Sequence, residues 1–164
     1  MKRDIGCWIP LKSFSERKNG GPSSIVIHYV SAKWSNPDRP YDMEEVITLL
    51  RAQKLSYHYI IGRGGNVVQC VDENDRAWHA GFGILFGKGD LNDTSIGVSF
   101  VATHDSGFND SQISSGVKLC REIVKDYEIP LNHVVGHSHV DWKRKVDPGQ
   151  NFPWIRFLND IANG

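Results

Sequence analysis

The sequence has no excess of charge of either sign. Its 164 residues include 19 basic and 19 acidic side chains, so the formal net charge at pH 7 is zero. Proteins that bind nucleic acid through a broad basic field neutralise many phosphates, and this balance argues against such a role. We therefore expect no nucleic-acid partner, with only a local basic patch left open.

Cysteine is scarce as well. The three cysteines, Cys7, Cys70 and Cys120, are an odd number and include no closely spaced pair. This pattern fits neither a disulfide framework nor a cysteine-rich zinc ribbon. A reducing compartment is the simplest interpretation.

Long apolar runs are also missing. None follows residues 1–4, and we predict neither a signal peptide nor a transmembrane helix. We expect a monomeric protein made in the cytoplasm and not inserted into membranes, although the sequence leaves the oligomeric state open. The length suits one domain with a core, predicted over residues 1–164. Residues 1–22 are expected to form an extension packed on or beside it, with 16–22 as an exposed loop.

Two predicted strands end in histidine. Residues 24–29 and 134–136 are short, mostly apolar stretches typical of buried strands. His28 lies at the end of the first, and His137 directly follows the second. His28 taken alone would be interpreted as a core histidine bonded to backbone. Two such strands, lying parallel or adjacent, would bring both imidazoles to one edge of the sheet.

A carboxylate and an ammonium follow the second histidine. Lys145 and Asp147 are two residues apart, so in an extended loop their side chains share a face. Pro148-Gly149 then ends the segment in a turn. With His28 and His137 the set suits a catalytic zinc, which uses three protein ligands and leaves the fourth position to water.

Helices alternate with further strands along the chain. Asp42 and Glu45 form a capping-box pattern that predicts a helix over 43–53, and Ser111 is expected to cap a long helix before Pro130. The other predicted elements are strands over 56–61, 66–71 and 95–101, a hairpin turn over 62–65 and a closing helix near 154–161. This alternation predicts an α/β fold in which helices flank a single mixed β-sheet.

The long helix also assigns a role to one cysteine. Cys120 shares a helical face with Ile113 and Val117. We therefore predict a core thiol and not a nucleophile.

The strand over 56–61 carries two tyrosines and a histidine. Alternation in a strand would place Tyr57 and Tyr59 on one side and His58 on the other. On this basis Tyr57 and His58 are not expected to line the same cleft.

Two loops are predicted near the histidines. Residues 76–81 mix an aromatic ring, an imidazole and small residues, as ligand-lining loops often do. The alternative is a structural turn in which Trp78 plugs the core. The glycine-rich stretch 81–89 lacks the Gly-Lys-Ser/Thr ending of a phosphate loop. We predict a mobile, partly apolar surface loop near the cleft.

Taken together, these segments resemble the zinc-dependent N-acetylmuramoyl-L-alanine amidases of the second type. That family includes bacterial wall-recycling amidases, phage lysins and animal peptidoglycan recognition proteins. The segments follow the family order over nearly the whole chain and are specific only jointly. They are residues 25–28, 56–61, 77–81, 92–98, 135–138 and 145–149.

The resemblance implies a ligand set and a reaction. His28, His137 and Asp147 would be the zinc ligands. The bond cleaved would be the amide between the lactyl group of N-acetylmuramic acid and L-alanine, in peptidoglycan or in muropeptides. The zinc would polarise the scissile carbonyl and lower the pKa of its water.

The resemblance also implies four supporting residues. Lys145 would stabilise the developing oxyanion. Tyr57 would hydrogen-bond the water or the tetrahedral intermediate. The implied substrate-binding residues are His79, at the sugar or the peptide, and Asn92.

One position departs from the family pattern. Wall-recycling members carry a glutamate that serves as general base where this chain has Ser99, and a hydroxyl cannot take a proton at pH 7 as a carboxylate can. This favours the branch that pairs a tyrosine with the lysine, as in phage lysins. We therefore expect a phage or prophage endolysin, released to the cell wall at lysis. The alternative is a cytoplasmic muropeptide-recycling amidase.

Two other classes are weighed against the enzyme. A recognition protein that binds muropeptide without cutting it would be signalled by loss of a metal ligand, but all three ligand positions carry competent residues. A purely structural zinc site is usually closed by four ligands and rich in cysteine, whereas the cysteines here lie outside the matching segments.

Overall fold

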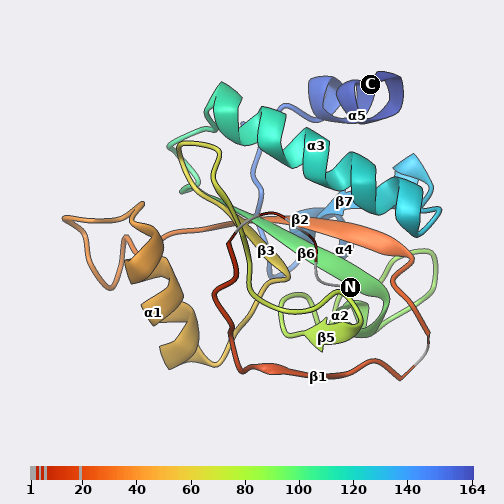
Figure 1. Cartoon of the computed structure of the whole chain (residues 1–164), viewed down its shortest axis with the longest axis horizontal. Helices are drawn as coiled ribbons and strands as arrows, with labels where there is room; N and C mark the ends of the chain where they lie inside the picture. The colour runs from red at the N-terminus through yellow and green to blue at the C-terminus, as the bar shows by residue number, and fades with distance from the viewer. Residues whose placement is uncertain (1–2, 4, 6, 19) are drawn as a thin grey trace.

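The computed structural model describes residues 3, 5, 7–18 and 20–164. Its centre is a five-stranded mixed sheet with the strand order β4-β3-β6-β2-β7 (Figure 1). Neighbouring strands are parallel except in the antiparallel β3–β4 hairpin. The strands are β2 (Ser24–Val30), β3 (Tyr59–Ile61), β4 (Val67–Gln69), β6 (Ser95–Val101) and β7 (Val134–Gly136).

A small second sheet and several helices surround this centre. The second sheet pairs β1 (Phe14–Glu16) with β5 (Asp75–Ala77) in antiparallel fashion. The helices are α1 (Met43–Gln53), α2 (Leu91–Thr94), α3 (Asp110–Asp126), the 3-10 turn η1 (Leu131–His133), α4 (His137–Val140) and α5 (Trp154–Asn163). In Figure 1, α3 and α5 lie side by side on the same side of the sheet. The predicted α/β fold with a mixed sheet flanked by helices is confirmed, and the two-stranded sheet is an addition to it.

Several element boundaries differ from those predicted. The strands expected over 56–61 and 66–71 each shrink to three residues, whereas helix 43–53 and strand 95–101 are confirmed. The long helix starts earlier than expected because Asn109 is its N-cap. The Gln112 side chain accepts from the backbone N–H of Asn109 at 3.2 Å. The Ser111 hydroxyl instead donates to the carbonyl oxygen of Arg63.

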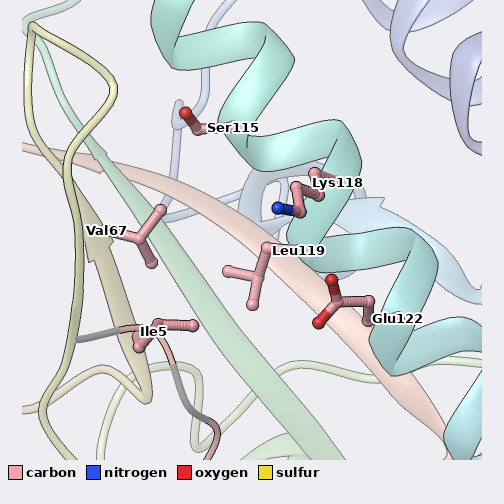
Figure 2. Close-up of a pocket in the computed structure, with 6 residues that line it drawn as sticks. All are labelled: Ile5, Val67, Ser115, Lys118, Leu119 and Glu122. Carbon is pink, nitrogen blue, oxygen red and sulfur yellow. The ribbon is translucent and has the colours of Figure 1, made fainter. Parts of the chain in front are cut away.

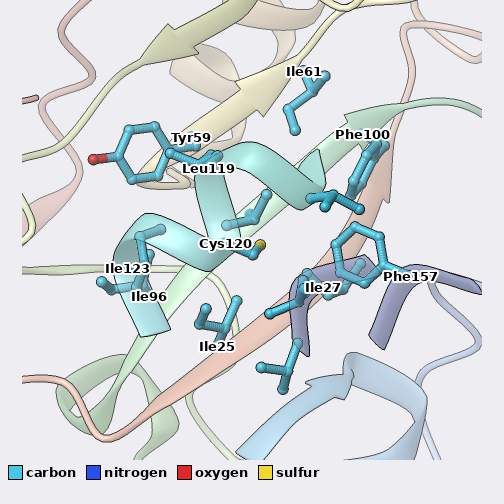
Figure 3. Close-up of a cluster of buried hydrophobic side chains, with 14 of the residues drawn as sticks. Ile25, Ile27, Tyr59, Ile61, Ile96, Phe100, Leu119, Cys120, Ile123 and Phe157 are labelled. Atoms are coloured by element: carbon cyan, nitrogen blue, oxygen red, sulfur yellow. The ribbon is translucent and has the colours of Figure 1, made fainter. Parts of the chain in front are cut away.

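Alternation along the central strands gives the sheet two different faces. On one face, Ile25, Ile27, Ile96 and Phe100 pack against α3 and α5 in the main core (Figure 3). Cys120 is fully buried there, which confirms the prediction of a core thiol. Because successive side chains point to opposite faces, the intervening residues of β2 and β6 face the other side.

That other face is covered by α1 and by residues 9–11. Leu11 is buried in a second core with Val46 and Leu50 of α1. Its backbone N–H donates to the carbonyl of Cys70, next to strand β4. In the part of the chain that the structure describes, no helix is long and apolar enough to cross a bilayer.

The loop expected to be exposed before β2 contains one deeply anchored side chain. The Arg17 guanidinium donates to the carbonyl oxygens of Glu73, Asn92, Asp93 and Ser95 at 2.6–3.2 Å. The loop prediction is therefore wrong for Arg17, because its guanidinium carries several N–H donors that bond the carbonyls around the junction of α2 and β6.

Candidate functional site

Two parallel neighbours place two imidazoles side by side. In the pairing of β2 with β7, Ile27 lies opposite Gly136, so the next residues, His28 and His137, emerge at the same edge. Their ring centroids are 4.6 Å apart. The strand geometry expected for these histidines is confirmed.

Asp147 completes a three-residue cluster. Its Oδ2 atom lies 2.8 Å from His28 Nδ1 and 3.2 Å from His137 Nδ1. One ligand atom from each of the three residues lies within 4.8 Å of the others. Two imidazoles and a carboxylate suit a catalytic zinc with an open position, and the same set also occurs in non-haem iron sites.

The electrostatics of the cluster favour the forms of these groups that bind metal. Burial lowers the pKa of His28 to about 4, although the Asp147 carboxylate works in the opposite direction. Burial by itself opposes the charge of Asp147, but hydrogen bonds with His137 and His28 outweigh it and hold the pKa of that carboxyl below its usual range. A neutral imidazole and an ionised carboxylate are the ligand forms that a divalent cation requires.

Tyr57 and His58 both lie on the site side of the sheet. Their ring centroids are 6.4 and 5.6 Å from that of His79. The prediction that they face opposite sides is wrong, because β3 begins only at Tyr59 and the two residues before it are not held in strand alternation. The ring of Tyr57 lies 5.0 Å from that of His28, and burial raises the pKa of its phenol.

His79 lies on the side of His28 that faces away from Asp147. Its Nδ1 atom is 3.0 Å from His28 Nε2, and the side chain is buried. The predicted loop around it begins instead as strand β5, and Trp78 is 37% exposed, so it does not plug the core. The contact of His79 with substrate stays a prediction.

Asn92 supports the segment that carries His79. Its Oδ1 atom accepts from the backbone N–H groups of His79 and Ala80 at 2.9 and 2.6 Å. These two bonds fix the turn that brings His79 under His28. The structure thus gives the buried Asn92 a positioning contact, and its predicted contact with substrate stays a prediction.

Lys145 and Ser99 complete the predicted group. Lys145 lies close enough for its positive charge to contribute to the lowered pKa of His28. Ser99 is the register partner of His28 in the β2–β6 pairing. Its Oγ atom is buried and lies close enough to the Tyr57 hydroxyl for the two side chains to interact.

Three residues near the site were not predicted from the sequence. The Ser95 Oγ atom lies 3.4 Å from His79 Nε2, and Arg17 donates to the Ser95 carbonyl. Burial, and after it the Asp147 charge, raises the pKa of the Tyr29 phenol. Tyr29 could have been noticed because it follows His28 directly. Ser95 and Arg17 carry no such signal, since only the packing of α2 against β6 brings them to the site.

Several apolar side chains of the stretch 81–89 are exposed. Phe82, Ile84 and Phe86 are 85%, 62% and 64% exposed, in agreement with a partly apolar surface loop.

A separate pocket lies between α3 and β4, lined by Val67, Leu119 and neighbouring residues (Figure 2). It is on the α3 side of the sheet, whereas the histidines are on the opposite face.

Comparison with known proteins gives consistent matches. The family model described as N-acetylmuramoyl-L-alanine amidase matches residues 18–150. The 1,6-anhydro-N-acetylmuramyl-L-alanine amidase AmpD of Haemophilus influenzae is 34% identical over 90% of this chain and 88% of the relative. A crystal structure of an AmpD derivative superposes with a TM-score of 0.81, at 26% identity, over 98% of this chain and 99% of the other. The amidase AmiD from E. coli, in complex with the substrate anhydro-N-acetylmuramic acid-L-Ala-D-gamma-Glu-L-Lys, gives a TM-score of 0.72 at 27% identity, over 92% of this chain and 66% of the other.

Proposed function

The chain belongs to the N-acetylmuramoyl-L-alanine amidase family and is an amidase that acts on peptidoglycan, and from this premise we propose that it is a metal-dependent amidase of soluble 1,6-anhydro muropeptides. The bond cleaved is the amide between N-acetylmuramic acid and L-alanine. The observation that carries the proposal is the convergence of one ligand atom each from His28, His137 and Asp147 within 4.8 Å.

We assign these three residues as the ligands of a zinc ion. The cluster has the donor types of a catalytic site, and the described part of the chain contributes no cysteine to it. Zinc held there would supply Lewis-acid activation of the scissile carbonyl and an acidic water as nucleophile.

Two further side chains act on the substrate in this proposal. The Lys145 ammonium stabilises the negative charge that develops on the carbonyl oxygen during attack. Tyr57 acts as a hydrogen-bond donor and not as a base, because burial raises the pKa of its phenol and keeps it protonated at neutral pH. Removing its hydroxyl alone is expected to cost less activity than removing Lys145, since the ring packing survives.

The comparisons favour the recycling alternative over the endolysin that the sequence first suggested. The AmpD relative is named for the 1,6-anhydro form of its substrate, and it spans nearly the same length as this chain. An endolysin, which acts on the polymeric wall, is the second candidate. The observation in its favour is Ser99, which occupies the position where the resemblance expects the glutamate of recycling members.

A comparison of two substrates separates these candidates. The zinc-loaded protein is incubated with a 1,6-anhydro muropeptide and, in parallel, with intact cell-wall sacculi, and products are identified by mass spectrometry. We expect release of stem peptides with a free N-terminal alanine from the soluble substrate, at least about tenfold faster per bond than from sacculi, and loss of both activities with chelator. Equal or faster cleavage of sacculi would favour the endolysin, and undiminished cleavage after complete zinc removal would contradict a metal-dependent reaction.

A further inference from the structure

A buried row of hydrogen-bonding groups extends behind His28, away from Asp147. His28 Nε2 lies 3.0 Å from His79 Nδ1, and His79 Nε2 lies 3.4 Å from Ser95 Oγ. The Ser95 hydroxyl in turn bonds the backbone carbonyl oxygen of Leu91. All three side chains are buried, so water does not compete for these bonds.

The carbonyl at the end of the row determines where each proton lies. The Leu91 carbonyl can only accept, so the Ser95 hydroxyl must donate to it. Ser95 Oγ can then accept from His79 Nε2–H, which leaves Nδ1 of neutral His79 bare. When a metal replaces the hydrogen bond between His28 Nδ1 and Asp147, the bare nitrogen of His79 accepts from His28 Nε2–H, and the lone pair of His28 lies on Nδ1, the atom that faces Asp147.

The chain is shaped to accept the His79 ring at this place. A Cβ atom on Gly97 would lie 2.6 Å from the His79 ring, so only glycine lets the imidazole rest on strand β6. Asn92 holds the backbone of His79 from the other side. The ring planes of His28 and His79 are 89° apart, so the Nε2–H bond of His28 meets its acceptor edge-on.

A neighbouring histidine shows that burial alone does not create this link. His58 is also buried, but its Nδ1 accepts from the Gly97 N–H at 2.9 Å and its Nε2 lies 3.0 Å from the Asp75 carbonyl oxygen. Both of its nitrogens are therefore bonded to backbone. Among the histidines described near the cluster, His79 is the one that bonds the second nitrogen of His28.

We propose that His79 is a positioning residue, which fixes the tautomer and ring orientation of His28 so that the Nδ1 atom of His28 is free to bind the metal. The Ser95 hydroxyl and the Leu91 carbonyl fix the tautomer of His79 in turn. Partners of this kind, behind a metal-binding histidine, typically contribute a factor of about 10 to 100 in metal affinity or activity. The inference rests on the proposed metal site, but it concerns a residue that does not itself touch the metal.

Zinc affinity, and not turnover alone, tests this assignment. The metal-free protein is titrated with zinc in competition with a chromophoric chelator at fixed pH, and thermal unfolding of each metal-free variant reports on its fold. His79→Leu should weaken zinc binding by about 10-fold to 100-fold. His79→Asn should recover most of the affinity, because the amide oxygen can replace Nδ1 as the acceptor from His28. The matched control is His133→Leu, since the Nδ1 of His133 bonds the Ser23 carbonyl, a backbone group outside the cluster.

Two additional variants separate the possible failures. His28→Ala should abolish tight zinc binding, and equal zinc affinity in this variant and the wild type would refute the metal site itself. If His28→Ala loses zinc while a folded His79→Leu binds it as tightly as the wild type, the role of His79 is refuted and the metal site stands. Should His79→Leu fail to fold, Ser95→Ala replaces it. A severalfold loss of zinc affinity supports the positioning role of His79, and an unchanged zinc affinity overturns it.

Discussion

Lys145 and Lys143 are two residues apart in one loop, but their ammonium groups meet different surroundings. Lys143 is exposed, with its Nζ atom 5.3 Å from the centre of the exposed Trp142 ring. Lys145 is half-buried, and its charge contributes to the lowered pKa of His28. Only Lys145 is therefore placed to act on charge that develops beside the cluster.

Replacing Lys145 with alanine should leave zinc content unchanged and reduce turnover. Loss of one group that stabilises an oxyanion typically costs about 100-fold to 1,000-fold in rate. Steady-state kinetics on the soluble muropeptide, with zinc measured on the same samples, provide the test. Lys143→Ala is the matched control and should retain activity within about twofold.

Ser99→Ala distinguishes a bystander hydroxyl from a proton acceptor. If Ser99 only fills the place of a family glutamate, its loss should change the rate little. A Ser99→Ala variant as inactive as Lys145→Ala would show that the serine belongs to the proton path and that Lys145 and Tyr57 do not suffice.

Strand pairing explains how much of the site the sequence could reveal. His28 and His137 were predictable because each follows a recognisable apolar run, and parallel neighbours bring such positions to one edge. The sides taken by Tyr57 and His58 were predicted wrongly, because a strand of three residues imposes alternation only over its own length. The contacts of Arg17 and Ser95 depend on how α2 packs beside β6, and no local pattern encodes that packing.

Helix α3 supports the sheet from the face opposite the site. Its periodicity predicted the buried face correctly, and Cys120 is fully buried between the sheet and the helix. Its cap was missed because several polar residues lie near the start of the helix, and the Ser111 hydroxyl bonds the Arg63 carbonyl instead of a helix N–H.

Cys120→Ala should separate packing from catalysis. Removing the buried sulfur leaves a small void, for which we expect a loss of about 1 kcal/mol in the free energy of unfolding. Activity and zinc content should stay at the wild-type level, because the thiol lies on the face opposite the cluster. Urea denaturation and kinetics on one preparation measure both, and an inactive but folded variant would show that the face was misassigned.

For the molecule as a whole, buried neutral histidines should make stability depend on pH. Burial lowers the pKa of His28 to about 4 and that of His58 to about 3, and it lowers the pKa of His79 well below its ordinary value. In the unfolded chain these groups titrate near about 6.5. Between these values the unfolded state binds more protons than the native state, so stability is full above about pH 6.5 and falls as the pH is lowered toward 4.

Urea unfolding of the metal-free protein at pH 7.5 and at pH 5 measures this effect. We expect a decrease at pH 5 on the order of 2 kcal/mol for each histidine that stays neutral in the native state. Exposed carboxylates titrate mostly below this window and contribute little to the difference. A free energy of unfolding that does not change between the two pH values would contradict the burial of neutral imidazoles.

Metal content tests the central claim most directly. The purified protein is saturated with zinc, freed of excess by gel filtration and analysed by mass spectrometry of the metal, alongside the His28→Ala, His137→Ala double variant. We predict one zinc per chain in the wild type, and less than about a tenth of that in a double variant that remains folded. Full zinc occupancy in the folded double variant would contradict the assignment of His28, His137 and Asp147 as the metal site.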